Sequence, residues 1–414
     1  MHRIGVIAPT PFFSDRGCHV RILGVMRALQ ELGNEVVLCT YHLGKDIPGI
    51  ETHRSLRIPW YQKTSAGPSV HKFYIDLLLL GTCARAFASR PPDALFASLH
   101  EGGFVGVVYK CFRNIPMIVD IQGSLTDECM AHRFLGGNRA AFRFLGFLER
   151  ESIRRADAVT ASSPMVADLL RERRMALPER IHLVPDGVDT AHFTPPEDKK
   201  RLREELGLPA DKTIVIFTGV LTEYQGVDIL LRAAAKIGGG KGNPFFLIVG
   251  YPDVENYRAM AEGLGLGERT LFTGRVDYQT MIPRYLAASD IAVSPKMHPS
   301  EANLKLLDYM AAGLPAVVFD TPVNRTVLGD DGIYARPGDE ESFAAALSAS
   351  LGDPAEAAAR GRRLRKRAEE RFSWRAIGRT IMEIYRGIMI GTFFGLLHLA
   401  AGELAECAEL TSLC

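Results

Sequence analysis

The chain has 414 residues, which is enough for two domains that each bury a hydrophobic core. It carries 49 Lys and Arg residues against 48 Asp and Glu residues, so its net charge of +1 gives no overall field that would favour nucleic acid. The seven cysteines are scattered and form no CxxC pair, which disfavours a disulfide framework or a zinc site and indicates a reducing compartment.

The first half of the chain alternates apolar strand patterns with helical spacing. Residues 3–9 form a strand pattern directly after the start, so we expect no secretory signal. Residues 22–32 then carry apolar side chains at helical spacing, and residues 35–41 form the next strand pattern. This order predicts a βαβ unit and a parallel sheet. Further strands are expected at residues 93–99, 116–121, 158–163 and 181–185.

Such a doubly wound domain binds ligands at the carboxyl ends of its strands, and polar residues follow two of them here. His100 opens the cluster after residues 93–99, and Gln122 lies in the cluster after residues 116–121. A lone histidine is either a structural hydrogen-bonding group or a catalyst, and both interpretations stay open for His100. Gln122 can hydrogen-bond a hydroxyl but cannot titrate. Gly17 ends the first loop, as a simple turn or as a close approach to a ligand.

A second series of strand and helix patterns follows a Pro-Asp-Gly turn at residues 185–187. Its strands are expected at residues 213–219, 245–250, 270–274, 291–294 and 315–320. The chain therefore predicts two successive α/β domains. The longest apolar runs, residues 73–80 and 387–402, are shorter than the roughly 20 residues that a membrane span needs. We therefore expect a cytoplasmic protein.

Residues 294–315 combine a strand end, a polar loop and a helix, and they are the most informative stretch of the chain. The loop carries Glu301, and the helix is expected to begin near Asn303 and to end at the Gly-Leu-Pro of residues 313–315. The first N–H groups of a helix lack internal partners and lie at the positive end of its dipole, so a phosphate fits there. Asp308 and Glu301 could then reach sugar hydroxyls. The alternative is an ordinary strand–loop–helix unit with two solvated acids.

Residues 308–315, DYMAAGLP, resemble the second half of the donor-site signature of retaining glycosyltransferases of family four, in which E-x(7)-E is followed by x-M-A-x-G-x-P. Residues 181–195 and 283–295 are similar to two further motifs of this family, in the same order along the chain. The resemblance covers about residues 3–386. It implies an α/β, GT-B fold, in which two doubly wound Rossmann-like domains face each other across a cleft.

The resemblance also implies a domain organisation. An acceptor-side domain is expected at residues 1–190 and a nucleotide-sugar domain at residues 191–372. A helix at residues 373–386 is expected to cross back to the first domain. Residues 387–414 match no pattern of the family, and we assign no role to them.

The sequence departs from the family in its charged residues. The position of the first signature Glu falls on Ser300, so Glu301 stands one residue late, and Asp308 replaces the second Glu. The family's Arg and Lys that neutralise the donor diphosphate correspond to Val220 and Gln225. We expect another cation to replace them, and the candidates are Lys296, Lys305 and Arg275.

The activity that the resemblance implies is retaining transfer of a hexose from a nucleotide diphosphate sugar to a hydroxyl acceptor. No Asp-x-Asp motif ends a strand in the second half, so we expect no metal and no other cofactor. Catalytic roles are expected for Glu301, His100 and Gln122. Donor contacts are expected from Gly17, Gly219, Gln225, Arg275, Lys296, Ser300, Ala302, Asn303, Leu304, Lys305 and Asp308.

The acceptors that the resemblance implies include lipid-linked glycans, polysaccharides and small molecules. Residues 134–155 alternate aromatic residues with arginines, so peripheral contact with the inner face of a membrane is one interpretation. A packed amphipathic helix with a solvated basic side is the other. Residues 360–371 are also strongly basic, and a solvated helical side is expected there.

Two alternatives to the transferase stay open. The neutral residues at positions 220 and 225 favour a catalytically inactive GT-B protein that only binds a sugar nucleotide. A sugar-nucleotide epimerase would need acids and a histidine to converge, and only His100, Glu101 and Glu301 offer themselves. A dinucleotide dehydrogenase is disfavoured because no G-x-G-x-x-G follows the first strand.

Overall fold

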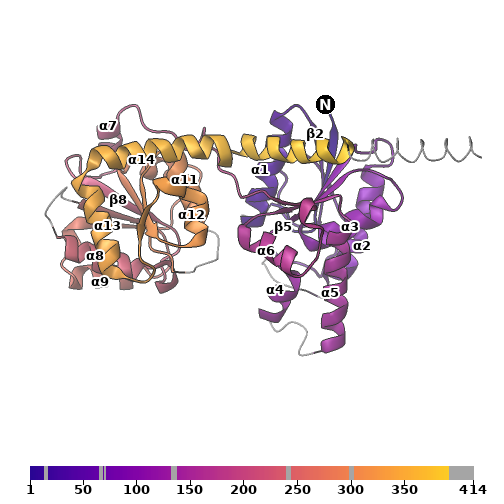
Figure 1. Ribbon diagram of the computed structural model, residues 1–414, viewed down its shortest axis with the longest axis horizontal. Helices are drawn as coiled ribbons and strands as arrows, with labels where there is room; N and C mark the ends of the chain where they lie inside the picture. The colour runs from indigo at the N-terminus through magenta and orange to yellow at the C-terminus, as the bar shows by residue number, and fades with distance from the viewer. Residues whose placement is uncertain are drawn as a thin grey trace, which may run out of the picture. The chain divides into compact units, whose positions relative to one another are not determined.

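The computed structural model describes residues 1–13, 17–64, 69, 71–131, 138–238, 244–297 and 303–390. The chain divides into two compact units, the first comprising residues 1–186 together with the chain from 377 onward, and the second residues 187–376. Each unit is a parallel sheet with helices (Figure 1). This confirms the predicted α/β class with two parallel-sheet domains.

The described part of the first unit holds a seven-stranded sheet in the order β3-β2-β1-β4-β5-β6-β7, in which every neighbouring pair is parallel. Its strands are β1 (Arg3–Ala8), β2 (Glu35–Thr40), β3 (Glu51–Arg54), β4 (Ala94–Ser98), β5 (Met117–Ile121), β6 (Ala158–Ala161) and β7 (Ile181–Leu183). Its labelled helices are α1 (Gly17–Glu31), α2 (Lys72–Ala86), α3 (Leu99–Lys110), α4 (Leu125–Ala131), α5 (Arg139–Arg154) and α6 (Pro164–Glu172).

The described part of the second unit holds a six-stranded sheet in the order β10-β9-β8-β11-β12-β13, again parallel throughout. Its strands are β8 (Thr213–Thr218), β9 (Pro244–Val249), β10 (Thr270–Gly274), β11 (Ile291–Ser294), β12 (Ala316–Phe319) and β13 (Ile333–Ala335). Its α-helices are α7 (Lys199–Glu205), α8 (Val227–Ile237), α9 (Val254–Gly263), α10 (Met281–Ala288), α11 (Lys305–Ala311), α12 (Pro322–Leu328), α13 (Glu340–Gly352) and α14 (Pro354–Arg367).

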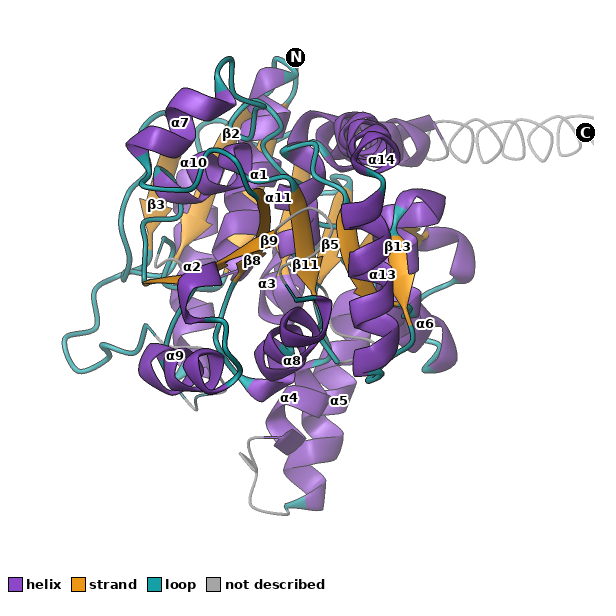
Figure 2. Cartoon of the chain, turned by 90° about the vertical axis from the view of Figure 1, so that its left-hand side faces the viewer, coloured by secondary structure: helices purple, strands orange, loops and turns teal. Residues whose placement is uncertain are grey.

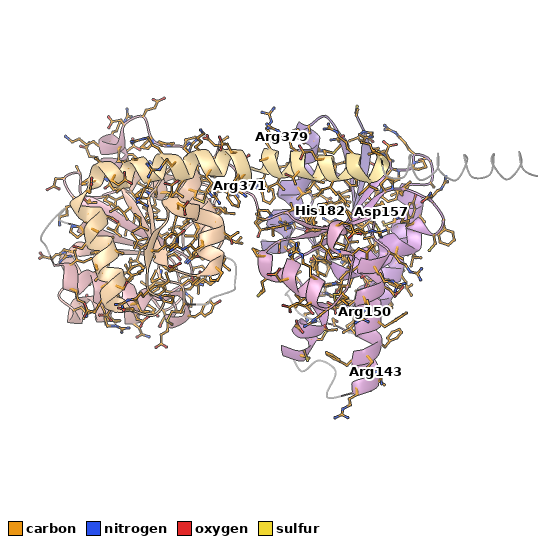
Figure 3. All side chains as sticks on the ribbon, in the orientation of Figure 1. Arg143, Arg150, Asp157, His182, Arg371 and Arg379 are labelled. Atoms are coloured by element: carbon orange, nitrogen blue, oxygen red, sulfur yellow. The ribbon has the colours of Figure 1, made fainter. Side chains whose placement is uncertain are left out.

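Alternation along the strands builds a core on each face of the second sheet. Ile214 and Ile216 of β8 belong to one buried apolar cluster, whereas Val215 and Phe217 belong to the other. Successive side chains of a strand point to opposite faces, so helices must cover both sides, as Figure 2 shows. In the first unit, Asp157 ahead of β6 accepts a hydrogen bond of 2.8 Å from the Met117 N–H and so links β6 to β5 (Figure 3).

Residues 374–390 are helical and extend beyond the predicted end at residue 386. Residues 377–390 group with the first unit, where the Tyr385 hydroxyl donates a 2.7 Å hydrogen bond to the carbonyl of Leu95. A Cβ at Gly378 would lie 2.9 Å from the Cβ of Ala28, so the helix packs closely on α1. In the described part of the chain, no helix combines the length and the apolarity needed to cross a membrane.

The structure also contains two strands that the sequence did not predict, β3 and β13. Both lie at the edge of a sheet. β3 has the sequence Glu-Thr-His-Arg and is partly exposed, so it lacks the apolar run on which the prediction depended. The polar cluster at residues 100–103 forms the first turn of α3, because Leu99, with a φ of 64°, turns the chain directly from β4 into the helix.

The hydrogen bond between Tyr385 and Leu95 generates a stability prediction. Tyr385→Phe should lower the free energy of unfolding by about 1–2 kcal/mol, because the buried carbonyl of Leu95 loses this donor. Urea denaturation of the purified protein measures this difference. Tyr251→Phe is the matched control, because its ring is 46% exposed. Equal unfolding free energies for Tyr385→Phe and the wild type would show that the bond contributes nothing net.

Candidate functional site

The strand order of the second sheet reverses between β8 and β11, which is where open α/β sheets bind ligands. Gly219 follows the carboxyl end of β8, and Lys296 lies two residues beyond β11. Lys305 begins α11, the next labelled helix. The fold therefore brings three of the predicted donor-site residues to one edge of one sheet.

Lys305 is the centre of this edge. Its ammonium donates a 2.9 Å hydrogen bond to Oε1 of Gln225 and lies 4.2 Å from the centroid of the Phe217 ring. In the described chain, no carboxylate forms an ion pair with it. A cation from α11 thus contacts the side chain of Gln225, one of the two positions at which the predicted charges are missing.

Burial disfavours the charged forms of both lysines, and the ammonium of Lys296 adds repulsion at Lys305. Burial lowers the pKa of Lys305 to about 7, with the ammonium of Lys296 as the second cause. Burial likewise lowers the pKa of Lys296 to about 8. Lys296 is only 5% exposed and its ammonium lies 5.4 Å from the centroid of the Tyr224 ring. An anion bound beside both groups would relieve this cost, because it favours their protonated forms.

Two glycines make room for the lysine and its loop. Gly219 has a φ of 133°, and a Cβ there would lie 2.8 Å from the ammonium nitrogen of Lys305. Gly226, with a φ of 74°, approaches the carbonyl oxygen of Pro295 so closely that a Cβ would lie 2.1 Å from it. A larger residue would be strained at either position and would displace its neighbour.

Asp308 lies one turn beyond Lys305 on α11. Both of its carboxylate oxygens accept from the Tyr278 hydroxyl, at 3.0 and 3.1 Å. Burial raises the pKa of Asp308 to about 7 despite this hydrogen bond, which lowers it. The ring of Tyr278 in turn packs edge-on against Phe193, with the centroids 6.2 Å apart. The carboxylate is therefore oriented by a tyrosine that the sequence analysis did not identify.

The side chain of Asn303 hydrogen-bonds within the protein and stabilises the fold. Its amide nitrogen donates to Oγ of Ser294 at 3.0 Å and to Oδ1 of Asn324 at 3.3 Å, and the residue is 5% exposed. These bonds tie the start of the helix to β11 and α12. The Leu304 side chain is 47% exposed and its backbone precedes α11. Ser300, Glu301 and Ala302 lie outside the described residues.

Arg275 lies just beyond β10, and its guanidinium lies over the ring of Tyr251, 5.1 Å from the centroid. Among the residues that the structure describes, no group of three or more His, Cys, Asp or Glu side chains is placed to hold a metal ion. Arg275 is thus a further cation beside the carboxyl end of β10.

Gln122 belongs to a buried polar network in the first unit. Its amide donates to Oδ2 of Asp120 at 3.3 Å. The same carboxylate accepts from Nε and Nη2 of Arg21, at 2.9 and 2.7 Å, and from the hydroxyl of Thr160 at 2.7 Å. Arg21 also donates to Asp186 at 3.2 Å. The charge of Arg21 is therefore neutralised within the protein. Gly17 is the first residue of α1, the helix that carries Arg21.

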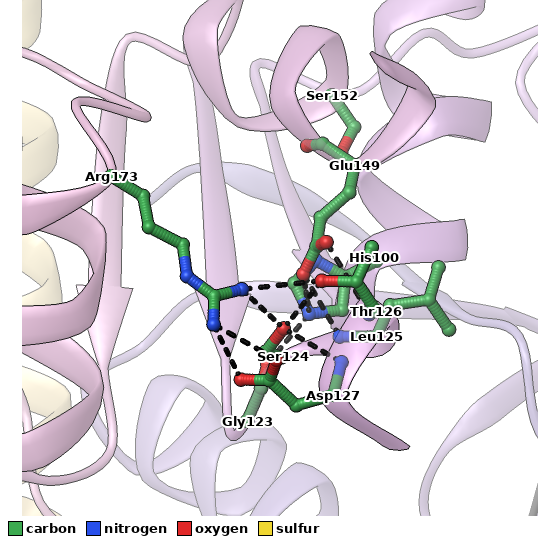
Figure 4. Close-up of polar contacts among 9 residues, drawn as sticks. All are labelled: His100, Gly123, Ser124, Leu125, Thr126, Asp127, Glu149, Ser152 and Arg173. Atoms are coloured by element: carbon green, nitrogen blue, oxygen red, sulfur yellow. Dashed lines mark hydrogen bonds and ion pairs between the residues drawn. The ribbon is translucent and has the colours of Figure 1, made fainter. Parts of the chain in front are cut away.

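His100 is fixed by the turn after β5 (Figure 4). Its Nε2 lies 2.6 Å from the carbonyl oxygen of Gly123 and 3.5 Å from Oε1 of Glu149. A carbonyl can only accept, so Nε2 carries a proton. Nδ1 is buried, and no described residue hydrogen-bonds to it. In the neutral ring this nitrogen is an acceptor, and it is the group that His100 could offer to a sugar hydroxyl.

Glu149 and Arg173 stabilise the same turn in different ways. Glu149 is 1% exposed and accepts from the Leu125 N–H at 2.9 Å, at the start of α4. The guanidinium of Arg173 donates to both carboxylate oxygens of Asp127 at 2.8 Å and to Oγ of Ser124 at 3.1 Å (Figure 4). No local pattern indicated either residue, because Glu149 on α5 and Arg173 directly after α6 are distant in sequence from the turn.

Two family descriptions match the chain. "Glycosyl transferase 4-like domain" covers residues 16–187, and "Glycosyl transferases group 1" covers residues 198–371. A D-inositol 3-phosphate glycosyltransferase from Acidothermus cellulolyticus is 32% identical over 367 residues, spanning 82% of this chain and 78% of that protein. An MMP alpha-(1->4)-mannosyltransferase from Mycolicibacterium hassiacum is 26% identical and spans 89% and 94%.

Solved structures agree on the fold. Anabaena Alr3699/HepE in complex with UDP is similar with a TM-score of 0.70 at 17% identity, over 94% of this chain and all of that chain. The same protein in complex with UDP-glucose gives a TM-score of 0.65 over the same shares. The two parallel-sheet units together with these neighbours show the GT-B fold.

The chain belongs to the family of glycosyl transferases group 1, of the family-four type. The predicted family is thereby confirmed, and with it glycosyltransferase activity.

The lowered pKa of Lys305 generates a prediction about stability and pH. Its folded pKa, about 7, lies below the unfolded value of about 10.5, so protons bind more tightly to the unfolded chain and stability rises with pH between these values. Lys305→Met should therefore increase the free energy of unfolding more at pH 6 than at pH 9. Lys236→Met, which removes a surface ammonium paired with Glu340 and Glu341, is the control. An increase in the free energy of unfolding that is equal at pH 6 and pH 9 would contradict the lowered pKa of Lys305.

Proposed function

We propose that this protein is a retaining glycosyltransferase that moves a hexose from a nucleotide diphosphate sugar to a hydroxyl acceptor without a metal ion. One observation carries the proposal: the ammonium of Lys305 lies at the switch point of the second sheet, hydrogen-bonded to Gln225 and without a carboxylate partner among the described residues. An uncompensated cation at this place suits a diphosphate.

The chemistry needs stabilisation of a leaving diphosphate more than it needs a general base. Fixed cations and N–H dipoles that face the developing negative charge supply this without reorganisation. We assign this role to Lys305, with Lys296 and Arg275 as further cations and Gly219 as the close backbone approach. The backbone around Ala302, Asn303 and Leu304, with Ser300, completes the proposed phosphate contacts.

The carboxylates have separate roles in the proposal. Asp308, which is oriented by Tyr278, accepts hydrogen bonds from the ribose hydroxyls. Glu301 orients the transferred hexose and so affects the chemical step. The first unit provides the acceptor side, with Nδ1 of His100 and the amide of Gln122 as groups for a sugar hydroxyl, and Gly17 as a close backbone approach.

The comparisons and the surface support a choice of partners to test. UDP-glucose is the first donor to test, because the neighbouring Anabaena protein binds UDP and UDP-glucose. A phosphorylated polyol is the first acceptor to test, because a relative is named for D-inositol 3-phosphate. Lipid-linked glycans and polysaccharides remain in the proposed acceptor range, with the protein acting in the cytoplasm at the inner face of a membrane.

A second candidate is a GT-B protein that binds a sugar nucleotide but does not transfer the sugar. The neutral residues Val220 and Gln225 favour it, because two expected diphosphate ligands are missing. Nucleotide release in the presence of donor and acceptor distinguishes such a binding protein from a transferase. The binder would be stabilised by the donor but would release no nucleotide.

The test is a coupled measurement of binding and turnover. Purified protein is screened by thermal shift against UDP-, GDP-, ADP- and TDP-sugars, and nucleotide release is then followed with the stabilising donor and an acceptor panel. Proton NMR of the product reports the anomeric configuration. We expect retention and full activity in EDTA. Inversion, or a loss in EDTA that magnesium restores, would disprove the mechanism, and stabilisation without release would favour the binder.

The charge assignment predicts a kinetic effect. Lys305→Met should cost about 2–4 kcal/mol of transition-state stabilisation, if one lost oxyanion contact is a fair guide. This corresponds to a fall in kcat/KM of roughly 30- to 1,000-fold. Lys296→Met and Arg275→Met should have smaller effects, since Lys305 is the cation that contacts Gln225, one of the two positions where the expected charges are missing. The double variant Lys305→Gln with Gln225→Lys should recover part of the lost kcat/KM, because it restores the contact between an ammonium and an amide oxygen with the two residues exchanged. If the kcat/KM of all three single variants stays within a few-fold of the wild-type value, the charge that stabilises the diphosphate comes from another residue.

The ribose assignment predicts a change in KM rather than in kcat. Asp308→Asn should raise the donor KM roughly 10- to 150-fold at pH 8, since a charge-assisted hydrogen bond is worth about 1.5–3 kcal/mol and acts in both ground and transition states. Asp308→Glu should be tolerated. Tyr278→Phe, which leaves the carboxylate in place, should have a smaller effect. An unchanged donor KM in a folded Asp308→Asn protein would place the donor elsewhere.

A further inference from the structure

Helix α5 presents two opposite faces. Leu145, Glu149, Ser152 and Ile153 are all at most 8% exposed and turn toward the first unit. Arg143, Phe147, Arg150 and Arg154 recur at the spacing of one helical stripe and are exposed. The outward face therefore consists of arginines with a phenylalanine among them.

The aromatic side chains of this face are largely exposed to solvent. Phe144 and Phe147, which are neighbours one turn apart, are each 57% exposed. Single exposed apolar residues are common on soluble proteins, but two aromatic rings side by side on an exposed helix face expose a contiguous apolar patch. Burying these rings against another surface is favourable.

Two of the three arginines of this face have no compensating acid among the described residues. Arg143 and Arg150 form no hydrogen bond or ion pair with any residue that the structure describes. The nearest acids on the helix are otherwise engaged: Glu149 accepts from the Leu125 N–H, and Glu151 lies 3.1 Å from Arg155 and 3.8 Å from Arg154. Figure 3 labels Arg143 and Arg150 on α5, with Arg143 pointing away from the unit.

We infer that this face of α5 docks the protein on an anionic phospholipid surface. The arginines would donate to lipid phosphates, and Phe144 and Phe147 would enter the boundary between head groups and acyl chains. Adjacent aromatic and basic residues on one helix face match the layered polarity of that surface, apolar below and negative above. A nucleic acid would complement the arginines but not the two rings.

The inference does not depend on the donor or acceptor chemistry. It identifies a surface by which an enzyme that no described helix anchors could reach an acceptor in a membrane. Each arginine near an anionic membrane contributes about fivefold to the partition coefficient.

The test is co-sedimentation of the full chain with vesicles of phosphatidylcholine alone or mixed equally with phosphatidylglycerol. We expect binding to the anionic vesicles that weakens with salt. Arg143→Gln with Arg150→Gln should lower the partition coefficient about 25-fold, and Phe144→Ser with Phe147→Ser more than tenfold. Phe112→Ser with Arg113→Gln is the matched control, because this exposed Phe-Arg pair lies beyond α3. It should bind as the wild type does.

A second readout distinguishes docking from loss of folding. Phe147→Trp should show fluorescence that shifts to the blue with anionic vesicles and is quenched by brominated lipid. Failure of the wild type to sediment, an equal loss in the control pair, or an unquenched Trp at position 147 would each overturn the inference. Binding to polyglutamate but not to vesicles would assign the face to an acidic protein and would also overturn it.

Discussion

An ammonium group without a carboxylate partner in the described chain is the constraint that shapes the second unit's ligand edge. Lys305 reaches Gln225 and the Phe217 ring, and Gly219 has no side chain where the ammonium lies. A half-buried cation costs free energy unless an anion compensates it, which is why burial lowers the pKa of Lys305. Such a cost is typical of sites that are completed by a ligand.

The first unit shows the opposite arrangement at a similar place in its own sheet. Arg21 is 2% exposed, yet two acids, Asp120 and Asp186, accept hydrogen bonds from it. This ion pair is complete within the protein, so Arg21 stabilises the fold and offers no charge to an anion. The two switch points thus share a topology but differ in electrostatics, and the difference favours a diphosphate on the second unit.

The sequence predicted what local patterns determine. β11 was predicted at its observed bounds, and the Gly-Pro ending after α11 was predicted because apolar strands and helix stops are short-range signals. The edge strands β3 and β13 were missed because short, partly exposed strands lack that signal. The contact of Tyr278 with Asp308 joins residues 30 positions apart and depends on how helices pack, which no local pattern encodes.

The basic run at residues 360–371 shows the same limit. A solvated helical side was predicted, and part of the run is exposed. Arg365, however, donates to the carbonyl oxygens of Phe193 and Ala311, and Arg367 donates to that of Val327. These guanidinium groups satisfy backbone acceptors in a loop and at the last turns of α11 and α12, a use that composition cannot distinguish from a charged surface.

The loss of the family's cations at positions 220 and 225 has a physical explanation in the contact between Gln225 and Lys305. Two ammonium groups at hydrogen-bond distance would repel each other, whereas the amide oxygen of Gln225 accepts from the Lys305 ammonium. A lysine at 305 therefore requires a neutral acceptor at 225. In the function proposed above, the positive charge stays close to position 225 although its residue lies 80 positions further along the chain. On our proposal, what looks in the sequence like the loss of a diphosphate site is the transfer of its charge to α11.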